Sequence, residues 1–384
     1  MKDYLSVQLL QWTYHYFKSR FGPRHEFKDY DYASGQTGIH RLDGSEATPG
    51  QPDDSDTRVS LVADWATGTA ESQKVADAVA KFNPHYTIHL GDVYYVGTKQ
   101  EVQENFFSRV DWPEGSRGSF ALNGNHEMYA KGKAYFERLL PTLGMRDTAT
   151  GQFGGQEASF FCLANDYWRI IGLDTGYNSV RRIPLLEYVI PPSCRLPDPL
   201  IKWLREQVKP EADKRGLVVL SHHQYYSVFE RGYEEPAKQL AAFIKRPVIW
   251  FWGHEHRLAV YGKYARKGGV EAYGRCMGHG GMPIEEFDKR PAKNFRQQKL
   301  VIYDARYNEV VGTQRIGFNG FINLTFSGNQ LFVDYRDIND KSVLTERWAV
   351  DVESGALKGL GVQQHVDMEI PKDLQLPSLE VAQS

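Results

Sequence analysis

The sequence predicts an α/β protein in which two mixed β-sheets pack face to face and are flanked by helices. Between residues 58 and 256, short apolar runs typical of buried strands alternate with segments whose apolar residues recur at helical spacing. This alternation indicates parallel strands joined by right-handed crossovers. From about residue 258 onward the chain is β-rich and includes the runs FINLTFS and QLFVDYRD. We expect these later strands to add antiparallel pairs to the parallel core.

The individual elements follow from the same patterns of apolar residues. Strands are expected at 58–64, 85–92 and 118–125, a hairpin at 158–165 and 167–174, and further strands at 216–223 and 246–254. Helices are expected at 71–81, 99–108, from about Tyr129, at 199–208 and at 237–244.

The first residues of the chain predict an N-terminal helical extension. Leu5, Leu9, Trp12 and Tyr16 recur at the spacing of one helical face. We expect this helix to pack on the main domain, and a contact with a partner or a membrane is the alternative. The N-terminus lacks the apolar core of a signal peptide, and no stretch approaches the roughly 20 apolar residues of a membrane span.

The remaining chain divides by composition into three predicted parts. Residues 1–57 are the extension and a linker, because 43–57 is rich in Gly, Pro and Asp. Residues 58–350 are expected to form the main domain with its β-rich C-terminal part. Residues 351–384 contain few apolar residues and are expected to form a C-terminal tail.

Composition and charge exclude some classes of partner. The 384 residues suffice for one large domain or two ordinary ones, and 41% of them are hydrophobic. The net charge of −2 argues against a nucleic-acid partner, so an acidic substrate would need a local site. Cys162, Cys194 and Cys276 are odd in number and lack CxxC spacing, which fits free thiols in a reducing compartment. We therefore expect a cytoplasmic protein.

Polar groups that can bind metals follow five of the predicted strands. In order, they are Asp64 in VADW, Asp92 and Tyr95 in LGDVYY, Asn125 and His126 in NGNHE, His222 and His223 in LSHHQ, and His254 and His256 in WGHEH. The loops at the carboxyl ends of strands form the functional crevice of open α/β sheets. Carboxylate, amide and imidazole groups are therefore expected to meet at one edge.

In these motifs the chain resembles the calcineurin-like metallophosphoesterase superfamily over roughly residues 58–285. GDxxY, GNHE, HH and GHxH occur in the order of that family. The resemblance implies its fold, a four-layer sandwich of two mixed sheets between helices. The first motif departs from the family at the second residue after Asp64. This position is Ala66 here, where most members have a metal-binding histidine. Purple acid phosphatases share this departure and replace the histidine with a tyrosine three residues after the second aspartate, which is Tyr95 here.

The resemblance implies a site for two metal ions. The first ion would be bound by Asp64, Asp92, Tyr95 and His256, and the second by Asp92, Asn125, His222 and His254. Asp92 would bridge the two ions. The phenolate and carboxylates of the first set suit Fe(III), and the amide and imidazoles of the second suit Fe(II), Zn(II) or Mn(II).

Several of these residues could have a structural role instead of binding metal or substrate. Tyr95 could be a core or rim tyrosine whose hydroxyl bonds a neighbour. Tyr94 is expected to be structural, because alternation along an extended chain turns it away from Tyr95. His223 and Glu127 could orient ligands or substrate instead of touching metal.

The expected reaction is hydrolysis of a phosphate ester, in which a metal-bound hydroxide attacks phosphorus in line. Asp92 and His126 are the catalytic candidates, and in the resembling family the histidine stabilises the transition state or protonates the leaving oxygen. The substrate-binding candidates are Asn125, His126, His223, Arg181, Arg182 and His279. Arg181 and Arg182 could instead be solvated surface residues, and His279 could belong to a tight turn.

A phosphomonoesterase acting on a small phosphorylated substrate is the leading hypothesis. A phosphodiesterase or nucleotide pyrophosphatase is the close alternative, because loops and not the ligand set decide specificity. A metal-binding scaffold without catalysis is a further possibility, although such a scaffold has no chemical need for His126. Redox chemistry at an iron pair has no dedicated motif. The oligomeric state is left open by the sequence.

Overall fold

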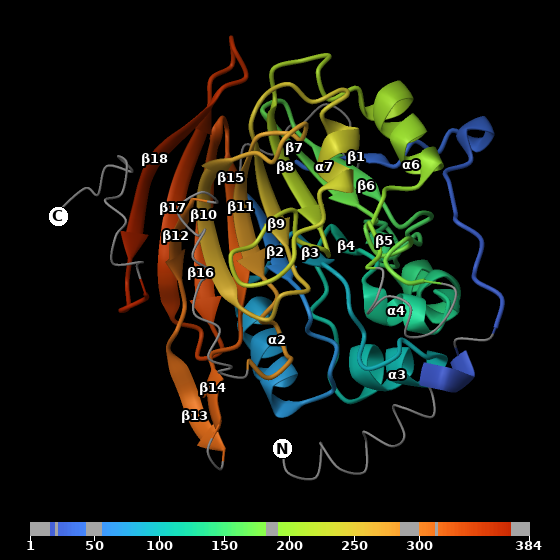
Figure 1. Ribbon diagram of the computed structural model, residues 1–384. Coiled ribbons are helices and arrows are strands. Elements are labelled where there is room, and N and C mark those ends of the chain that lie inside the picture. Colours follow the sequence, from blue (N-terminus) through green and yellow to red (C-terminus); the bar gives the residue numbers. More distant parts are fainter. Residues whose placement is uncertain are drawn as a thin grey trace.

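The computed structural model describes residues 16–19, 22–43, 56–181, 191–284, 299–311 and 314–369. Most of the strands within these ranges belong to two eight-stranded mixed sheets. Figure 1 shows the two sheets with helices on their outer faces. The predicted α/β architecture of two packed mixed sheets flanked by helices is therefore confirmed.

The first sheet contains the later parallel strands of the chain. Its order is β1 (Ile39–Arg41), β6 (Phe161–Ala164), β7 (Trp168–Leu173), β8 (Gly216–Ser221), β9 (Val248–Trp252), β11 (Ala272–Met277), β10 (Leu258–Tyr264) and β12 (Leu300–Tyr303). The segment from β7 through β8 and β9 to β11 is parallel. β6 and β7 form the antiparallel hairpin expected from the sequence.

The second sheet joins the earliest predicted strands to the C-terminal ones. Its order is β18 (Leu357–Gln364), β17 (Ser342–Val350), β16 (Gln330–Asp337), β15 (Gly320–Ser327), β2 (Thr57–Val62), β3 (Tyr86–His89), β4 (Gly118–Ala121) and β5 (Gly144–Met145). β2, β3 and β4 are parallel, whereas β15 to β18 form an antiparallel meander. A separate two-stranded hairpin consists of β13 (Tyr307–Val311) and β14 (Gln314–Gly317), and it projects from the body in Figure 1.

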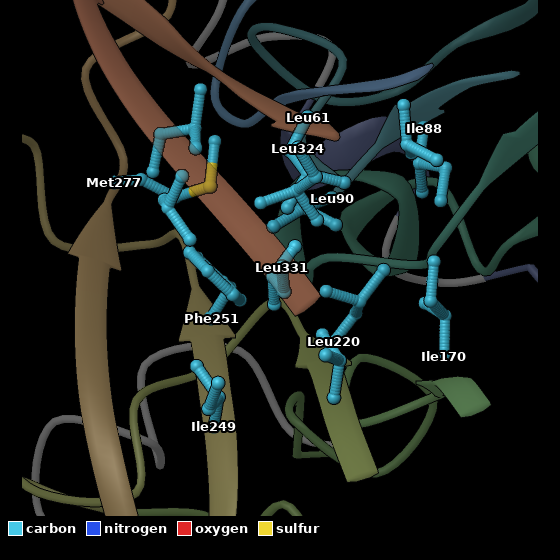
Figure 2. Packing of buried hydrophobic residues seen from close by; sticks show 14 of the residues in the cluster. Leu61, Ile88, Leu90, Ile170, Leu220, Ile249, Phe251, Met277, Leu324 and Leu331 are labelled. Carbon is cyan, nitrogen blue, oxygen red and sulfur yellow. The ribbon is translucent and has the colours of Figure 1, made fainter. Parts of the chain in front are cut away.

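The hydrophobic core lies between the two sheets. Figure 2 shows side chains of both sheets in this layer, including Leu61 and Ile88 from the second sheet and Ile170 and Phe251 from the first. All four are fully buried. Burying such side chains stabilises a fold by about 1.5–3 kcal/mol each, so this layer fixes how the two sheets face one another.

Helices cover the outer faces of both sheets. They are α2 (Ala70–Phe82), α3 (Lys99–Val102), α4 (Asn125–Tyr129), α6 (Asp198–Trp203) and α7 (Glu235–Leu240). α3 and α6 continue as wider π-helical turns to Ser108 and Val208. Val75 and Val79 of α2 pack on the second sheet, and Leu200 of α6 and Leu240 of α7 pack on the first. The helices were expected close to these places, but α4 begins at Asn125 and not near Tyr129.

Both predicted extensions contribute to the sheets. β1 from the N-terminal extension pairs with β6, and β18 from the expected C-terminal tail pairs with β17. The amphipathic pattern at Leu5, Leu9 and Trp12 lies outside the described residues, whereas residues 16–19 are helical. None of the helices within the described ranges is both long and apolar enough to cross a membrane.

Candidate metal centre

The predicted ligands meet where loops of the two sheets face each other. Asp64, Asp92 and Asn125 follow β2, β3 and β4 of the second sheet. His222 and His254 follow β8 and β9 of the first sheet. The second sheet therefore supplies the carboxylates and the amide, and the first sheet supplies the imidazoles.

Asp64 is fully buried and lies among donors from both sheets. Its Oδ2 accepts a hydrogen bond from the His254 backbone N–H at 2.9 Å, and its Oδ1 lies 3.4 Å from Nε2 of His256. Burial opposes ionisation, but the hydrogen bond from His256 and the charge of His222 outweigh it, so the pKa of Asp64 is lowered. This carboxylate is therefore held in its ionised form.

Asp92 lies at the centre of the cluster. Its Oδ1 accepts from the backbone N–H of His126 at 3.0 Å, and its Oδ2 lies 3.2 Å from Nε2 of His222. Burial again opposes ionisation, but the charges of His222 and His126 hold the pKa of Asp92 well below its usual value. One ligand atom from each of Asp64, Asp92 and His222 lies within 4.8 Å of the others. This closeness fits a carboxylate that bridges two ions.

His222 presents one particular ring nitrogen to the cluster. Its Nδ1 lies 3.0 Å from the Leu90 carbonyl oxygen, which can only accept, so Nδ1 carries the proton. Nε2 then faces Oδ1 of Asn125 at 3.2 Å as well as Asp92. Burial lowers the pKa of His222, but Asp92 and Asp64 outweigh it and raise it to about 9. Nε2 of His222 therefore lies among the carboxylates and the amide of the cluster.

A second group of imidazoles adjoins the first. Ligand atoms of His222, His223 and His254 all lie within 4.8 Å of one another. Burial lowers the pKa of His254 to about 4, so its ring is neutral and can bind a metal. Nδ1 of His223 lies 3.1 Å from the Thr175 hydroxyl, which leaves Nε2 for this group. His223 is thus placed beside the predicted ligands.

Tyr94 brings its phenol to the carboxylates. The Tyr94 hydroxyl donates to Asp64 Oδ1 at 2.7 Å, and it lies 3.3 Å from Asp92 Oδ2 and 2.9 Å from His256 Nε2. The sequence-based expectation was a structural tyrosine, and the structure places its hydroxyl among the candidate ligands. Alternation ends at β3, because Asp92 has a φ of 73° and the chain then turns. Asp92 itself, preceded by Gly91, was the available signal, since Gly-Asp marks the end of an extended run.

Tyr95 contributes backbone groups to the same loop. Its N–H donates to Glu101 Oε1 at 2.7 Å, and its carbonyl oxygen lies 2.6 Å from Nδ1 of His126. The carbonyl can only accept, so Nδ1 of His126 carries a proton and Nε2 is directed to Asp92, 3.7 Å from Oδ2. Tyr95 therefore orients the catalytic candidate His126.

A profile of the Calcineurin-like phosphoesterase family matches residues 57–258, which is more than half of the chain. The chain belongs to this family. The match contains all five strand ends of the cluster described above. No curated protein sequence matches the chain.

Several solved structures match the chain at low identity. Purple acid phosphatase PPD1 from yellow lupin (Lupinus luteus) seeds is 15% identical with a TM-score of 0.45, over 80% of this chain and 56% of that one. PhoD is 12% identical with a TM-score of 0.49, over 80% and 72%. GAP50, the anchor in the inner membrane complex of Plasmodium, is 13% identical with a TM-score of 0.45, over 86% and 97%. The chain thus spans little more than half the length of the lupin enzyme.

The donor set of the cluster fits metal ions. Two buried carboxylates, a phenol, an amide oxygen and imidazoles converge from five loops, and the carboxylates are ionised. Isolated buried carboxylates are very costly, so this arrangement requires compensating positive charge. The Tyr94 phenol and the His256 imidazole lie beside Asp64, and the imidazoles of His223 and His254 lie beside His222.

Glu127 supports the loops of the cluster by accepting backbone hydrogen bonds. Its carboxylate accepts from the backbone N–H groups of Asp92 at 3.3 Å, Val93 at 2.8 Å and Gly124 at 2.9 Å. Burial and the charge of Asp92 raise the pKa of Glu127 to about 8. It therefore ties the loop after β3 to the loop after β4, as one of the two sequence-based alternatives expected.

The weaker substrate-binding candidates have different outcomes. Arg181 donates to the Pro191 carbonyl oxygen at 3.2 Å, and Arg182 lies outside the described residues. His279 is buried and its ring faces Gly320, where an added Cβ would lie 2.8 Å from Nε2. This position in the turn after β11 packs His279 against β15, so the structure does not bring its ring into the cluster. The adjacent Gly278 lies against Asp64, since a Cβ there would be 2.9 Å from Oδ2.

Proposed function

We propose that this chain hydrolyses phosphate monoesters at a site that binds two metal ions. The observation that carries the proposal is the convergence of Asp64 and Asp92 with His222 and His254 across the two sheets, with His126 beside Asp92. A phosphate ester needs positive charge and a proton donor within one site, and this cluster provides a place for both.

The two ions would share Asp92. The first would be bound by Asp64, Asp92, His256 and the phenol of Tyr94, which replaces Tyr95 in the set expected from the sequence. The second would be bound by Asp92, Asn125, His222 and His254. The phenol and carboxylates favour Fe(III) in the first position, and Fe(II), Zn(II) or Mn(II) fits the second. Bound there, the ions would lower the pKa of an attacking water and attract the non-bridging phosphate oxygens.

His126 is the proton donor of the proposal. Its Nδ1 is tied to the Tyr95 carbonyl oxygen at 2.6 Å, which fixes the ring with Nε2 toward Asp92. A proton on Nε2 can pass to the leaving oxygen of the ester, which is typically worth about 10²–10⁴ in rate. Asn125 and His223 both lie beside His222 and are proposed to contact the phosphate, while Arg181 remains a candidate for the rest of the substrate.

A diester or nucleotide pyrophosphate is the second candidate substrate class. The metal cluster would serve either reaction, because specificity depends on the surrounding loops. A scaffold without catalysis is less well supported, because an ordered His126 facing Asp92 has no role in it. The buried and unpaired cysteines support the expected cytoplasmic location.

The test is a substrate panel on protein loaded with iron, zinc or manganese. An aryl phosphate monoester, a diester and a nucleoside diphosphate would be assayed with wild type and with Asp92→Asn. We expect the monoester to be turned over fastest, and Asp92→Asn to lose both bound metal and at least about 10²-fold in kcat/KM. Faster turnover of the diester or the nucleotide would replace the monoester proposal. Turnover of none of them by protein that retains two ions would favour the scaffold.

A further inference from the structure

Tyr129 holds the amide of the candidate metal ligand Asn125. The two residues lie four apart in α4, so their side chains share one helix face. Nδ2 of Asn125 donates to the Tyr129 hydroxyl at 3.0 Å, and Oδ1 faces Nε2 of His222 at 3.2 Å. The hydrogen bond to Tyr129 therefore holds the amide with its oxygen directed into the cluster.

The orientation matters because the two ends of an amide are similar in shape and opposite in chemistry. The oxygen can bind a cation, whereas the NH₂ group can only donate hydrogen bonds. With its NH₂ held by Tyr129, Asn125 presents oxygen to the second ion without a rotational search. Groups that orient a metal ligand in this way commonly change metal affinity by about 10–100-fold when they are removed.

Tyr129 is in turn packed by the N-terminal segment, which we define as residues 16–19 and 22–27. The rings of Tyr16 and Tyr129 meet edge to face, with centroids 5.1 Å apart. Tyr16 is buried, with 6% of its surface exposed. The Tyr129 ring also lies beside the His126 ring, at 4.9 Å between centroids. The Tyr129 ring is thus in contact with both the N-terminal segment and the proton-donor candidate.

The N-terminal segment is also attached next to α4 further along. The His25 backbone N–H donates to the Lys131 carbonyl oxygen at 2.9 Å, and the His25 ring stacks on Phe136 at 4.8 Å. The Tyr177 hydroxyl donates to the His25 carbonyl oxygen at 2.8 Å, and the Arg24 guanidinium lies 3.4 Å above the Tyr177 ring. These contacts place the segment against the loops that follow α4 and β7.

We propose that the N-terminal segment is a working part of the metal centre. Tyr16 holds the ring of Tyr129, and Tyr129 orients Asn125 for the second ion. Both tyrosines are positioning residues. The inference rests on the proposed function only in taking Asn125 as a ligand of the second ion.

The test measures metal binding and not turnover. Metal-free protein would be titrated with Co²⁺, and the two binding steps followed by the visible absorption of the ion. We expect Tyr129→Phe, which keeps the ring and removes the hydroxyl, to weaken the second step by about 10-fold and leave the first unchanged. We expect Tyr16→Leu to weaken the same step. Tyr167→Leu is the matched control, because Tyr167 is 40% exposed and lies in the turn between β6 and β7, outside the N-terminal segment.

A purely structural role would give a different pattern. It would lower the melting temperature of the metal-free variants without changing the ratio of the Co²⁺ affinities of the two binding steps. Wild-type affinity for the second ion in both Tyr129→Phe and Tyr16→Leu would overturn the inference. A wild-type protein that binds two ions and hydrolyses no phosphate ester would refute the proposed function alone, because the titration does not depend on turnover.

Discussion

At the scale of single residues, the centre depends on backbone conformations that side chains rarely adopt. Asp64, Asp92 and His254 have φ values of 56°, 73° and 65°, in the left-handed region. Such conformations cost about 1–3 kcal/mol each and persist where the surroundings enforce them, as at functional sites. Here each turns the chain sharply after a strand. The turn at Asp92 carries the Tyr94 hydroxyl to Asp64.

The two neighbouring tyrosines give a direct test of this geometry. A phenolate bound to Fe(III) has a visible ligand-to-metal charge-transfer band, so iron-loaded and oxidised protein should be violet to pink. We expect Tyr94→Phe to abolish the band, because its hydroxyl lies 2.7 Å from Asp64. Tyr95→Phe is the matched control and should retain the band. The measurement is the visible absorption spectrum of iron-loaded wild type, Tyr94→Phe and Tyr95→Phe. A band lost only in Tyr95→Phe would restore Tyr95 as the metal ligand, as expected from the sequence.

At the scale of elements, strand alternation in β3 explains an unusual histidine. Tyr86 and Ile88 face the core between the sheets, so Thr87 and His89 face the helices on the other side. His89 is fully buried, its ring lies near Trp65, Phe106 and Trp112, and neither ring nitrogen has a hydrogen-bond partner among the described residues. Burial lowers its pKa from 6.5 to about 3.

This histidine should make the fold sensitive to acid. The unfolded chain binds a proton at His89 below about pH 6.5, whereas the folded protein keeps the ring neutral down to about pH 3. The neutral His89 ring therefore makes its full contribution to the free energy of unfolding above pH 6.5. This contribution falls as the pH decreases, by about 2 kcal/mol at pH 5. The free energy of unfolding would be measured by urea denaturation at pH 7 and at pH 5. We expect His89→Phe to remove the part of the decrease between these two pH values that comes from His89. The control is His365→Phe, at an exposed histidine, which should leave the pH dependence of the free energy of unfolding unchanged. The same pH dependence in wild type and both variants would contradict the role of His89.

At the scale of the whole molecule, a buried ion pair joins the two sheets. Arg275 of β11 donates to both carboxylate oxygens of Glu346 in β17, at 2.8 and 2.7 Å. The Tyr335 hydroxyl of β16 donates to the same carboxylate at 2.6 Å. All three side chains are buried within the layer between the sheets. The pair fixes the relative position of two sheets that each carry half of the metal centre.

Breaking this pair should be costly. Glu346→Ala leaves the Arg275 guanidinium buried without its carboxylate, which typically destabilises a protein by about 3–5 kcal/mol. We expect a loss of that size in urea denaturation of the metal-free protein. Glu206→Ala, which removes an exposed ion pair with Lys202 within α6 and its continuation, should change stability by less than about 1 kcal/mol. Losses of similar size in the two variants would show that the buried pair does not hold the sheets together.

Much of the fold could be predicted because its signals are local. The buried runs at β2, β3, β8 and β9 and the amphipathic spacing of α2 are read directly from neighbouring residues. β18 was missed, because Leu357–Gln364 has few apolar residues and is a strand only through its pairing with β17. α4 was placed late, because its start at Asn125 depends on Glu127 accepting from the Gly124 N–H.

By itself the sequence determined which residue types end each strand, and hence that carboxylates, an amide and imidazoles would gather at one place. The residue types are read from each strand's own sequence, and their common location follows from the parallel direction of the strands. Only the tertiary structure decided that Tyr94 faces the carboxylates, that Tyr129 holds Asn125, and that Tyr16 reaches this site from the N-terminal segment. These contacts depend on the turn at Asp92 and on the packing of distant segments, which no periodicity within the chain encodes.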